Sequence, residues 1–235
     1  MLFFRNCIQS KSLTRHSNPR YLKKICAPLQ VQICKIQIYL KKKESGNVEF
    51  DKGLAWLTDN ALSVLDFGCG SGTALFLCNK YGTDTHIGID LSSQAIKSAI
   101  EKSKMIENGN FQFLCGGIEA LKGIQDESMD SAILSNIIDN LYPDDAISVL
   151  EEIKRILKKN GKLLVKLNPF ISDEQIEKYG IKKISGNLLD DGMILWNNTN
   201  EEWEDILGAR YSISDYVEIY YEEYGQINRM YLLTK

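Results

Sequence analysis

The sequence is poor in the side chains that most often build metal and redox centres. It contains two histidines, His16 and His86, and its six cysteines include no Cys-x-x-Cys pair. Zinc sites need closely spaced Cys and His ligands, and disulfide frameworks belong mainly to short secreted chains. We therefore expect no metal site and no disulfide framework, and we interpret the cysteines as reduced thiols of a cytoplasmic protein.

Long apolar runs are missing, and so are acidic residues near the N-terminus. No stretch approaches the roughly 18 uninterrupted apolar residues of a membrane-spanning helix, which argues against an integral membrane protein. Residues 1–43 contain ten Lys and Arg and no Asp or Glu, whereas the other 192 residues carry 18 basic and 31 acidic side chains. We interpret residues 1–43 as a basic arm, mobile or a lid, with a transit peptide as the alternative. The acidic remainder repels phosphate backbones, which argues against a nucleic acid partner.

From Asn60 onwards, strand-like and helix-like segments alternate. This alternation is typical of βαβ units and a parallel sheet. Strands are predicted at residues 63–67, 85–90, 110–115, 129–135, 162–167, 214–221 and 226–233.

Helix boundaries and one hairpin are also predicted from local signals. The first helix of the alternation is expected at residues 73–80, and Ser92 or Ser93 is expected to cap the next one, to about residue 105. Pro143 opens a helix that is expected to end near residues 160–161. Residues 185–196 predict a β-hairpin with its turn at residues 190–192. A further helix is expected at residues 201–207, capped by Thr199 or Asn200.

The strongest functional signal is the segment VLDFGCGSG at residues 64–72. An apolar strand reaches Asp66 near its end and continues into a glycine turn before a helix. Glycine allows the backbone to approach a ligand closely, and free N–H groups at a helix N-terminus suit a carboxylate or phosphate. Eighteen residues after Gly72 the next strand ends in Asp90, which can accept hydrogen bonds from ribose hydroxyls. Together these features predict a nucleoside-containing ligand at the carboxyl edge of the sheet.

Two ligands of this kind compete, a nicotinamide dinucleotide and S-adenosylmethionine (SAM). The dinucleotide fingerprint GxGxxG has Thr73 in place of its third glycine, and Asp66 is unfavourable near a pyrophosphate. A carboxylate at this position suits the cationic amino-acid end of SAM instead. The Gly-Lys-Ser/Thr of a phosphate-binding loop does not follow.

The segment VLDFGCGSG resembles the first motif of class I SAM-dependent methyltransferases. The similarity continues through HIGIDLS, FLCGGIEAL, ESMDSAILSNIIDNLYP and LEEIKRILKKNGKLLVKLNP, and covers about residues 60–170. It implies one Rossmann-like α/β domain at residues 44–235, with a seven-stranded mixed sheet, helices on both faces and an antiparallel last strand. The hairpin near residues 185–196 would be an insertion. SAM is the implied cofactor.

The resemblance also implies roles for individual residues. Asp66 and the glycines of the turn would line the methionine end of SAM, Asp90 would hold the ribose hydroxyls, and Leu91 would flank the adenine. The family often has an acidic residue where Gly117 stands, so here the backbone N–H and the packing of Ile118 would remain. The implied cofactor-binding set is Asp66, Gly68, Cys69, Gly70, Gly72, Asp90, Leu91, Gly117, Ile118, Ser135 and Asn136, with Cys69 chiefly a packing residue.

Methyl transfer depends mainly on alignment, exclusion of water and, for some acceptors, removal of a proton. Ser135 and Asn136 would lie beside the transferred methyl group. His86 is expected near the start of the second strand, away from the ligand, so we expect no histidine base. Asp139 and Tyr142 are the predicted catalytic residues, Asp139 accepting a proton or orienting a substrate amine; use of no base is the alternative.

The hairpin is expected to fold over the acceptor. Trp196 and Met193 would form the apolar wall of that pocket, whereas Trp203 has the helical spacing of a core residue. The Asn168-Pro169-Phe170 segment is similar to the Asn-Pro-Pro-Tyr motif of amino-methylating enzymes, but it follows the fifth strand rather than the fourth. This argues against methylation of adenine N6 or glutamine.

The sequence therefore predicts a SAM-dependent methyltransferase with a small-molecule acceptor. One alternative is an RNA or protein methyltransferase that docks through the basic arm. Another is a non-catalytic SAM-binding module. The oligomeric state is left open.

Overall fold

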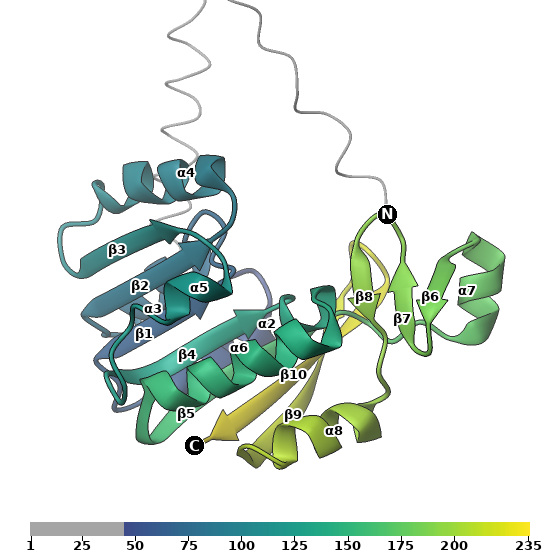
Figure 1. Cartoon of the computed structure of the whole chain (residues 1–235). Helices are drawn as coiled ribbons and strands as arrows, with labels where there is room; N and C mark the ends of the chain where they lie inside the picture. The colour runs from purple at the N-terminus through teal and green to yellow at the C-terminus, as the bar shows by residue number, and fades with distance from the viewer. Residues whose placement is uncertain (1–44) are drawn as a thin grey trace, which may run out of the picture. The chain divides into compact units, whose positions relative to one another are not determined.

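A seven-stranded mixed sheet forms the centre of the protein (Figure 1). The structure is a computed structural model that describes residues 45–235; the predicted basic arm, residues 1–43, lies outside the described residues. The strand order is β3-β2-β1-β4-β5-β10-β9. The strands are β1 (Ser63–Phe67), β2 (Thr85–Asp90), β3 (Asn110–Cys115), β4 (Met129–Ser135), β5 (Leu157–Leu167), β9 (Ser212–Tyr221) and β10 (Gln226–Thr234).

The first five strands of the sheet are parallel, and β10 is antiparallel to both β5 and β9. This confirms the predicted Rossmann-like sheet and its antiparallel last strand. Every residue of β1 is buried, as expected for a central strand covered on both faces. Because parallel strands end at the same edge, the loops that follow β1, β2 and β4 lie together.

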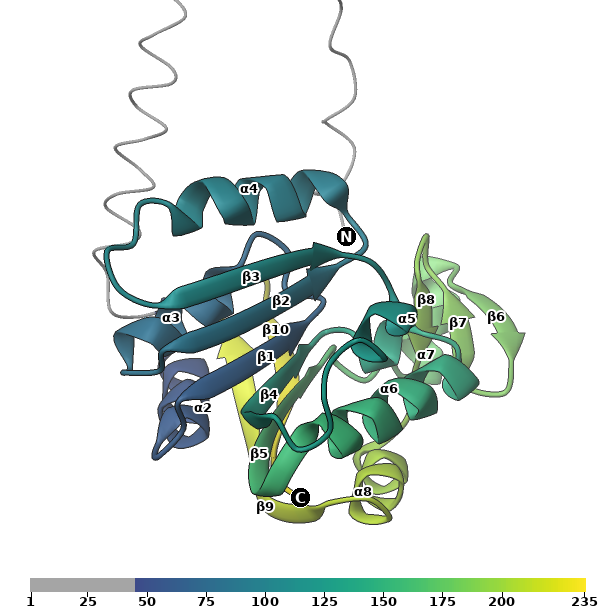
Figure 2. The same cartoon turned by 60° about the vertical axis from the view of Figure 1, so that its left-hand side comes forward.

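Helices cover both faces of the sheet, as predicted (Figure 2). Alternate strand residues enter two separate apolar cores: Val64 and Leu164 pack on one side, Leu65 and Val165 on the other. The first core is covered by α2 (Val48–Thr58), α3 (Thr73–Lys80) and α4 (Ser93–Ser103). The second is covered by α5 (Ile118–Leu121), α6 (Pro143–Ile156) and α8 (Asn200–Gly208).

The helix boundaries follow the predicted caps with one exception. The Ser92 hydroxyl accepts the N–H of Ala95 at 3.2 Å and caps α4, and α6 begins at Pro143. However, α6 ends at Ile156, and the chain is already extended in β5 where the helix was expected to continue to residues 160–161. Asn160 has a left-handed φ of 61°, and the register between β4 and β5 shifts here. The Asn-Gly pair therefore marks an irregularity within β5 and not a helix end.

The predicted hairpin is confirmed and belongs to a second, three-stranded sheet. It consists of β7 (Leu188–Asp190) and β8 (Ile194–Trp196), and β6 (Lys182–Ser185) adds the third strand. This small sheet and the preceding α7 (Asp173–Tyr179) lie beyond the carboxyl ends of β1, β2 and β4 (Figures 1 and 2). None of the helices among residues 45–235 is both long and apolar enough to cross a bilayer.

Candidate functional site

The glycine turn after β1 has a backbone that only glycine adopts easily. Gly68, Gly70 and Gly72 have φ values of 81°, 52° and 81°. A Cβ on Gly68 would overlap the side chain of Ile137, and one on Gly72 would lie 2.9 Å from the ring of Phe76. A Cβ on Gly70 would meet nothing within 4 Å. Side chains therefore pack closely against both ends of the turn, and there is open space at its middle.

Asp90 links this turn to the loop after β2. Its carboxylate accepts the N–H of Gly70 at 2.8 Å on one oxygen and the N–H of Ser92 at 2.8 Å on the other. Lys102, on α4, adds a second link by donating to the Ser71 hydroxyl at 2.6 Å. Lys102 was not found from the sequence, because no motif connects it to the turn. Each Asp90 oxygen keeps a lone pair for a further donor.

Asp66 is a buried carboxyl group that lacks a partner. Its side chain is 3 % exposed, and its Oδ1 is buried without a hydrogen bond. Burial, and then the nearby charge of Asp90, raise the pKa of Asp66 to about 7. An unpaired buried carboxylate is costly, so Asp66 is suited to receive a proton, a cation or a hydrogen-bond donor.

Hydrogen bonds join the residues at the end of β4 to those at the end of β5. Asn136, in a left-handed conformation with φ 57°, donates its N–H to the carbonyl of Lys166 and its Nδ2 to Asn168 Oδ1, both at 2.6 Å. Asn168 in turn donates its N–H and Nδ2 to Asp139 Oδ2, at 2.6 and 2.9 Å. The Oδ1 atoms of Asn136 and Asp139 are buried without partners.

Asp139, predicted as catalytic, lies in the 3-10 turn η1 (Ile138–Asn140) and has no exposed surface. Burial raises its pKa, against the lowering effect of its hydrogen bonds with Asn168. Its Oδ2 is engaged by Asn168 and its Oδ1 has no partner, so its catalytic role stays a prediction. Tyr142, the other predicted catalytic residue, precedes α6 and is half exposed.

The loops after β2 and β3 bring Leu91 and Gly117 together. Leu91 is 77 % exposed, and a Cβ on Gly117 would lie 3.4 Å from its Cδ2. The Gly117 N–H donates to Glu119 Oε1 at 2.7 Å, a contact not anticipated from the sequence. Ile118 packs against the core on the α6 side.

The Cys69 side chain packs beneath the glycine turn. It is buried in the core on the α2 side, its Sγ lies against Gly88, and burial raises the pKa of the thiol. Its side chain is thus a packing group.

His86 lies at the opposite edge of the sheet, near the start of β2. Its ring nitrogens lie 2.7 Å from Thr83 Oγ1 and 3.2 Å from the carbonyl of Asn110. Burial lowers its pKa to about 4, so the ring is neutral at physiological pH.

Trp196, the predicted wall of the acceptor pocket, lies at the end of β8 and is 9 % exposed. Its ring is buried in the core, in an edge-on contact with Trp203 at 5.0 Å between ring centroids. Met193 is 62 % exposed at the hairpin turn, and Trp203 is a core residue as predicted. β8 nevertheless contacts η1, so the hairpin adjoins the turn that contains Asp139.

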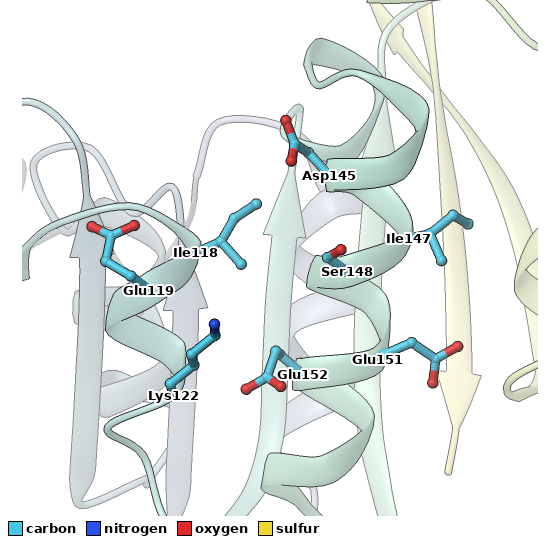
Figure 3. Close-up of a pocket in the computed structure, with 8 residues that line it drawn as sticks. All are labelled: Ile118, Glu119, Lys122, Asp145, Ile147, Ser148, Glu151 and Glu152. Atoms are coloured by element: carbon cyan, nitrogen blue, oxygen red, sulfur yellow. The ribbon is translucent and has the colours of Figure 1, made fainter.

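Four of the eight side chains that line a groove between α5 and α6 are acidic (Figure 3). Two of them are engaged elsewhere: Glu151 pairs with Arg210 at 2.7 Å and Glu152 with Arg155 at 2.7 Å. Across residues 45–235, no cluster of three or more His, Cys, Asp or Glu side chains is arranged to hold a metal ion.

The arrangement of the sheet and the glycine turn agrees with comparisons to known proteins. The family model described as "Methyltransferase domain" matches residues 58–200. The chain belongs to this methyltransferase family. Its fold is that of the class I SAM-dependent methyltransferase superfamily, whose cofactor is SAM.

Individual relatives differ in their acceptors. The chain is 34 % identical over 100 residues to a ribosomal protein L11 methyltransferase of Thermosipho melanesiensis, covering 43 % of this chain and 35 % of the relative. It is 26 % identical over 176 residues to a tRNA N(3)-methylcytidine methyltransferase of Schizosaccharomyces pombe, covering 70 % and 57 %. These matches thus span about a third to somewhat over half of the curated relatives' length.

Among solved structures, the chain resembles the 1,6-didemethyltoxoflavin-N1-methyltransferase of Burkholderia thailandensis. That structure contains 1,6-didemethyltoxoflavin and S-adenosylhomocysteine. The TM-score is 0.64 at 16 % identity, with 95 % of this chain and 93 % of the other covered. At this identity the likeness concerns the fold alone.

Proposed function

We propose that this protein is a SAM-dependent methyltransferase with a small-molecule acceptor. The observation that supports this most directly is the open glycine turn with the unpartnered buried carboxyl of Asp66 behind it. Asp90, at the end of the neighbouring strand, adds an acceptor for hydroxyl groups on the same edge of the sheet.

The residues present fit SAM. Asp66 would bind its ammonium group directly or through water, and the N–H groups at the start of α3, which has no side-chain cap, suit its carboxylate. Asp90 would accept hydrogen bonds from the ribose hydroxyls, Leu91 would pack on the adenine, and Gly117 and Ile118 would line the adenine from the next loop. When bound, SAM supplies an electrophilic methyl group on its sulfonium sulfur.

The protein's own contribution is alignment and exclusion of water. Ser135 and Asn136 lie at the end of β4, which is the strand between β1 and β5. They would orient the atom of the acceptor that receives the methyl group. Asp139 holds this segment through Asn168, so we assign it a positioning role. Such preorganisation suits an acceptor that is already a good nucleophile, because correct positioning alone lowers the barrier substantially.

The charge of the domain favours a small acceptor. The residues after the basic arm carry 18 basic and 31 acidic side chains, which disfavours a polyanion. Because the tRNA-modifying relative aligns with most of this chain, an RNA acceptor bound through the basic arm is the second candidate. We also propose a cytoplasmic location, where cysteines are kept as reduced thiols.

Calorimetry with S-adenosylhomocysteine, combined with a matched pair of glycine variants, tests the proposal. Gly70→Ala and Gly180→Ala both introduce a Cβ at a positive φ, of 52° and 64°, where no atom lies within 4 Å. We expect both to lower stability by about 1 kcal/mol through backbone strain. Only Gly70→Ala should weaken binding, by at least about tenfold, because its methyl group enters the ligand's space.

Two results would contradict the proposal. One is the absence of binding to the wild-type protein with no shift in its thermal unfolding, since a ligand at a hundred times its Kd stabilises by about 2.7 kcal/mol. The other is equal affinity in the Gly70→Ala variant. Transfer of labelled methyl groups from SAM to a panel of amines, phenols and thiols then tests the catalytic step.

A further inference from the structure

Two lysines project from the same face of β5 but have different surroundings. Lys162 and Lys166 are four residues apart, so both lie on the side of Leu164, which packs beneath α2. Lys162 Nζ donates to the carbonyls of Trp56 and Asp59, at 2.8 and 2.9 Å, at the C-terminal end of α2. Lys162 therefore has the contacts of a structural lysine.

Lys166 has no comparable oxygen partners. Among residues 45–235, no carboxylate lies within 4 Å of its Nζ, and its hydrogen-bond contact is a long one of 3.5 Å to the Tyr221 hydroxyl. The rings of Phe50 and Tyr221 flank the ammonium, with centroids 5.4 and 5.5 Å from Nζ. Aromatic faces attract a cation but accept none of its protons in strong hydrogen bonds. An ammonium has three donors, so Lys166 retains donors for a ligand.

This lysine is beside the place where the methyl group would be transferred. Lys166 is paired in register with Ser135, and its carbonyl accepts the N–H of Asn136 at 2.6 Å. Asp66 is on the same face of β1, where it pairs with Ile133 of β4. Adjacent strands are about 4.8 Å apart, so Lys166 lies two strands, or about 10 Å, from the strand of Asp66. Asp66 on β1, Ser135 on β4 and Lys166 on β5 thus lie on one face of the sheet, with Asp66 nearest the expected SAM site and Lys166 farthest from it.

Burial supports a ligand-binding role for this ammonium. Lys166 is partly buried, and desolvation lowers its pKa, while the charge of Asp139 acts in the opposite direction. One negative charge on a ligand would offset the cost of holding this half-buried ammonium without a close counter-ion. A single carboxylate matches it, whereas a phosphate dianion would leave an excess negative charge near Asp66 and Asp90.

We propose that Lys166 is a specificity-determining residue that binds a carboxylate group on the small-molecule acceptor, with the rings of Phe50 and Tyr221 packing against the acceptor's apolar body. This inference rests on the proposed methyltransferase function. It places the acceptor's reactive atom towards Ser135 and Asn136 and its carboxylate towards β5.

Matched pairs of neutral and anionic probes test this proposal on the full chain saturated with S-adenosylhomocysteine. The probes are 4-hydroxybenzoate with 4-hydroxybenzamide and indole-3-acetate with indole-3-acetamide, measured by calorimetry. We expect the wild-type protein to bind at least one carboxylate about tenfold more tightly than its amide. Lys166→Met and Lys166→Gln should remove this preference, and Lys166→Arg should keep it.

Lys162→Met is the control, because Lys162 also lies over an aromatic ring of α2, 5.1 Å from the Trp56 centroid, but at the other end of β5. It should lower thermal stability and leave the carboxylate preference intact. A wild-type protein with no carboxylate preference for either pair, or with no binding of any probe, overturns the proposal. So does an unchanged preference in a Lys166 variant that retains S-adenosylhomocysteine binding. Failure of the wild-type protein to bind S-adenosylhomocysteine would instead refute the methyltransferase function.

Discussion

Buried polar atoms without partners are concentrated at the carboxyl ends of β1 and β4. Such atoms are rare in folded proteins and indicate either stored strain or a missing partner. Three of the five found among the described residues are the Oδ1 atoms of Asp66, Asn136 and Asp139. The other two, Asn198 Nδ2 and Trp203 Nε1, are donors. A site with several unpaired hydrogen-bond acceptor atoms favours a ligand that carries hydrogen-bond donors or positive charge.

Asp66→Asn should stabilise the ligand-free protein and weaken SAM binding. The folded-state pKa of about 7 lies above the ordinary 3.8, so the folded protein holds the extra proton between these values. The contribution of Asp66 to stability is therefore full below pH 4 and is lost as the pH rises to 7, at about 1.4 kcal/mol for each pH unit. Asn abolishes this loss, and thermal unfolding at pH 8 should show a higher Tm.

Binding provides the second readout for Asp66. SAM affinity should increase with pH up to about 7 in the wild-type protein, because the cation binds the ionised carboxylate, and this dependence should be absent in Asp66→Asn. Asp205→Asn, on the exposed surface of α8, is the control and should alter neither property. A SAM affinity that is equally pH-dependent in both variants would exclude the assigned role of Asp66.

At the scale of elements, a buried polar network joins the end of β5 to β10 and to the segment after β8. Arg229 of β10 is 4 % exposed and donates to the carbonyl of Asn168 at 3.1 Å and to that of Asn198 at 2.8 Å. Asn168 is bound to both Asn136 and Asp139. The loop after β4 is therefore held by elements that lie far apart in the sequence.

Asp139→Asn distinguishes a positioning residue from a general base. Asn keeps an oxygen that can accept the N–H of Asn168, so we expect the variant to fold and kcat to fall by less than about tenfold. Loss of a general base costs about 100-fold or more. The measurement is kcat with the best acceptor of the methylation panel, together with its pH profile. A large fall in kcat, with unchanged S-adenosylhomocysteine affinity, would restore Asp139 as a base.

At the scale of the whole molecule, charge separates the two candidate acceptor classes. Residues 1–43 carry Lys and Arg but no Asp or Glu, and the remaining chain has an excess of acidic side chains. A polyanion would thus be attracted by the arm and repelled by the domain. A small acceptor responds to neither field strongly, because few charges are involved.

Replacing Lys41, Lys42 and Lys43 by Gln in the full chain should leave S-adenosylhomocysteine affinity unchanged. With labelled SAM, we expect neither the wild-type protein nor the triple variant to transfer methyl groups to bulk tRNA. The RNA candidate predicts the opposite: transfer that falls steeply between about 50 and 200 mM salt and is reduced in the triple variant. Filter assays of labelled tRNA at these two salt concentrations decide between them.

The amino-acid sequence by itself determined the sheet, the glycine turn and the two acidic strand ends. These depend on short-range signals: apolar runs of strand length, glycines at positive φ and carboxylates at strand ends. Even the three-residue strands of the hairpin were predictable from their turn. The helix α2 was not, because its start depends on Asn47 capping the N–H groups of Glu49 and Phe50, with no strong motif around it.

Only the tertiary structure decided which side chains meet. Asn168 follows β5, yet it contacts Asn136 and Asp139 after β4, because neighbouring parallel strands end side by side. Trp196 of β8 packs edge-on against Trp203 of α8, a contact that depends on how these two elements meet at the core. Lys166 and Phe50 are more than a hundred residues apart, and no local pattern can record a contact that depends on how α2 packs across the sheet.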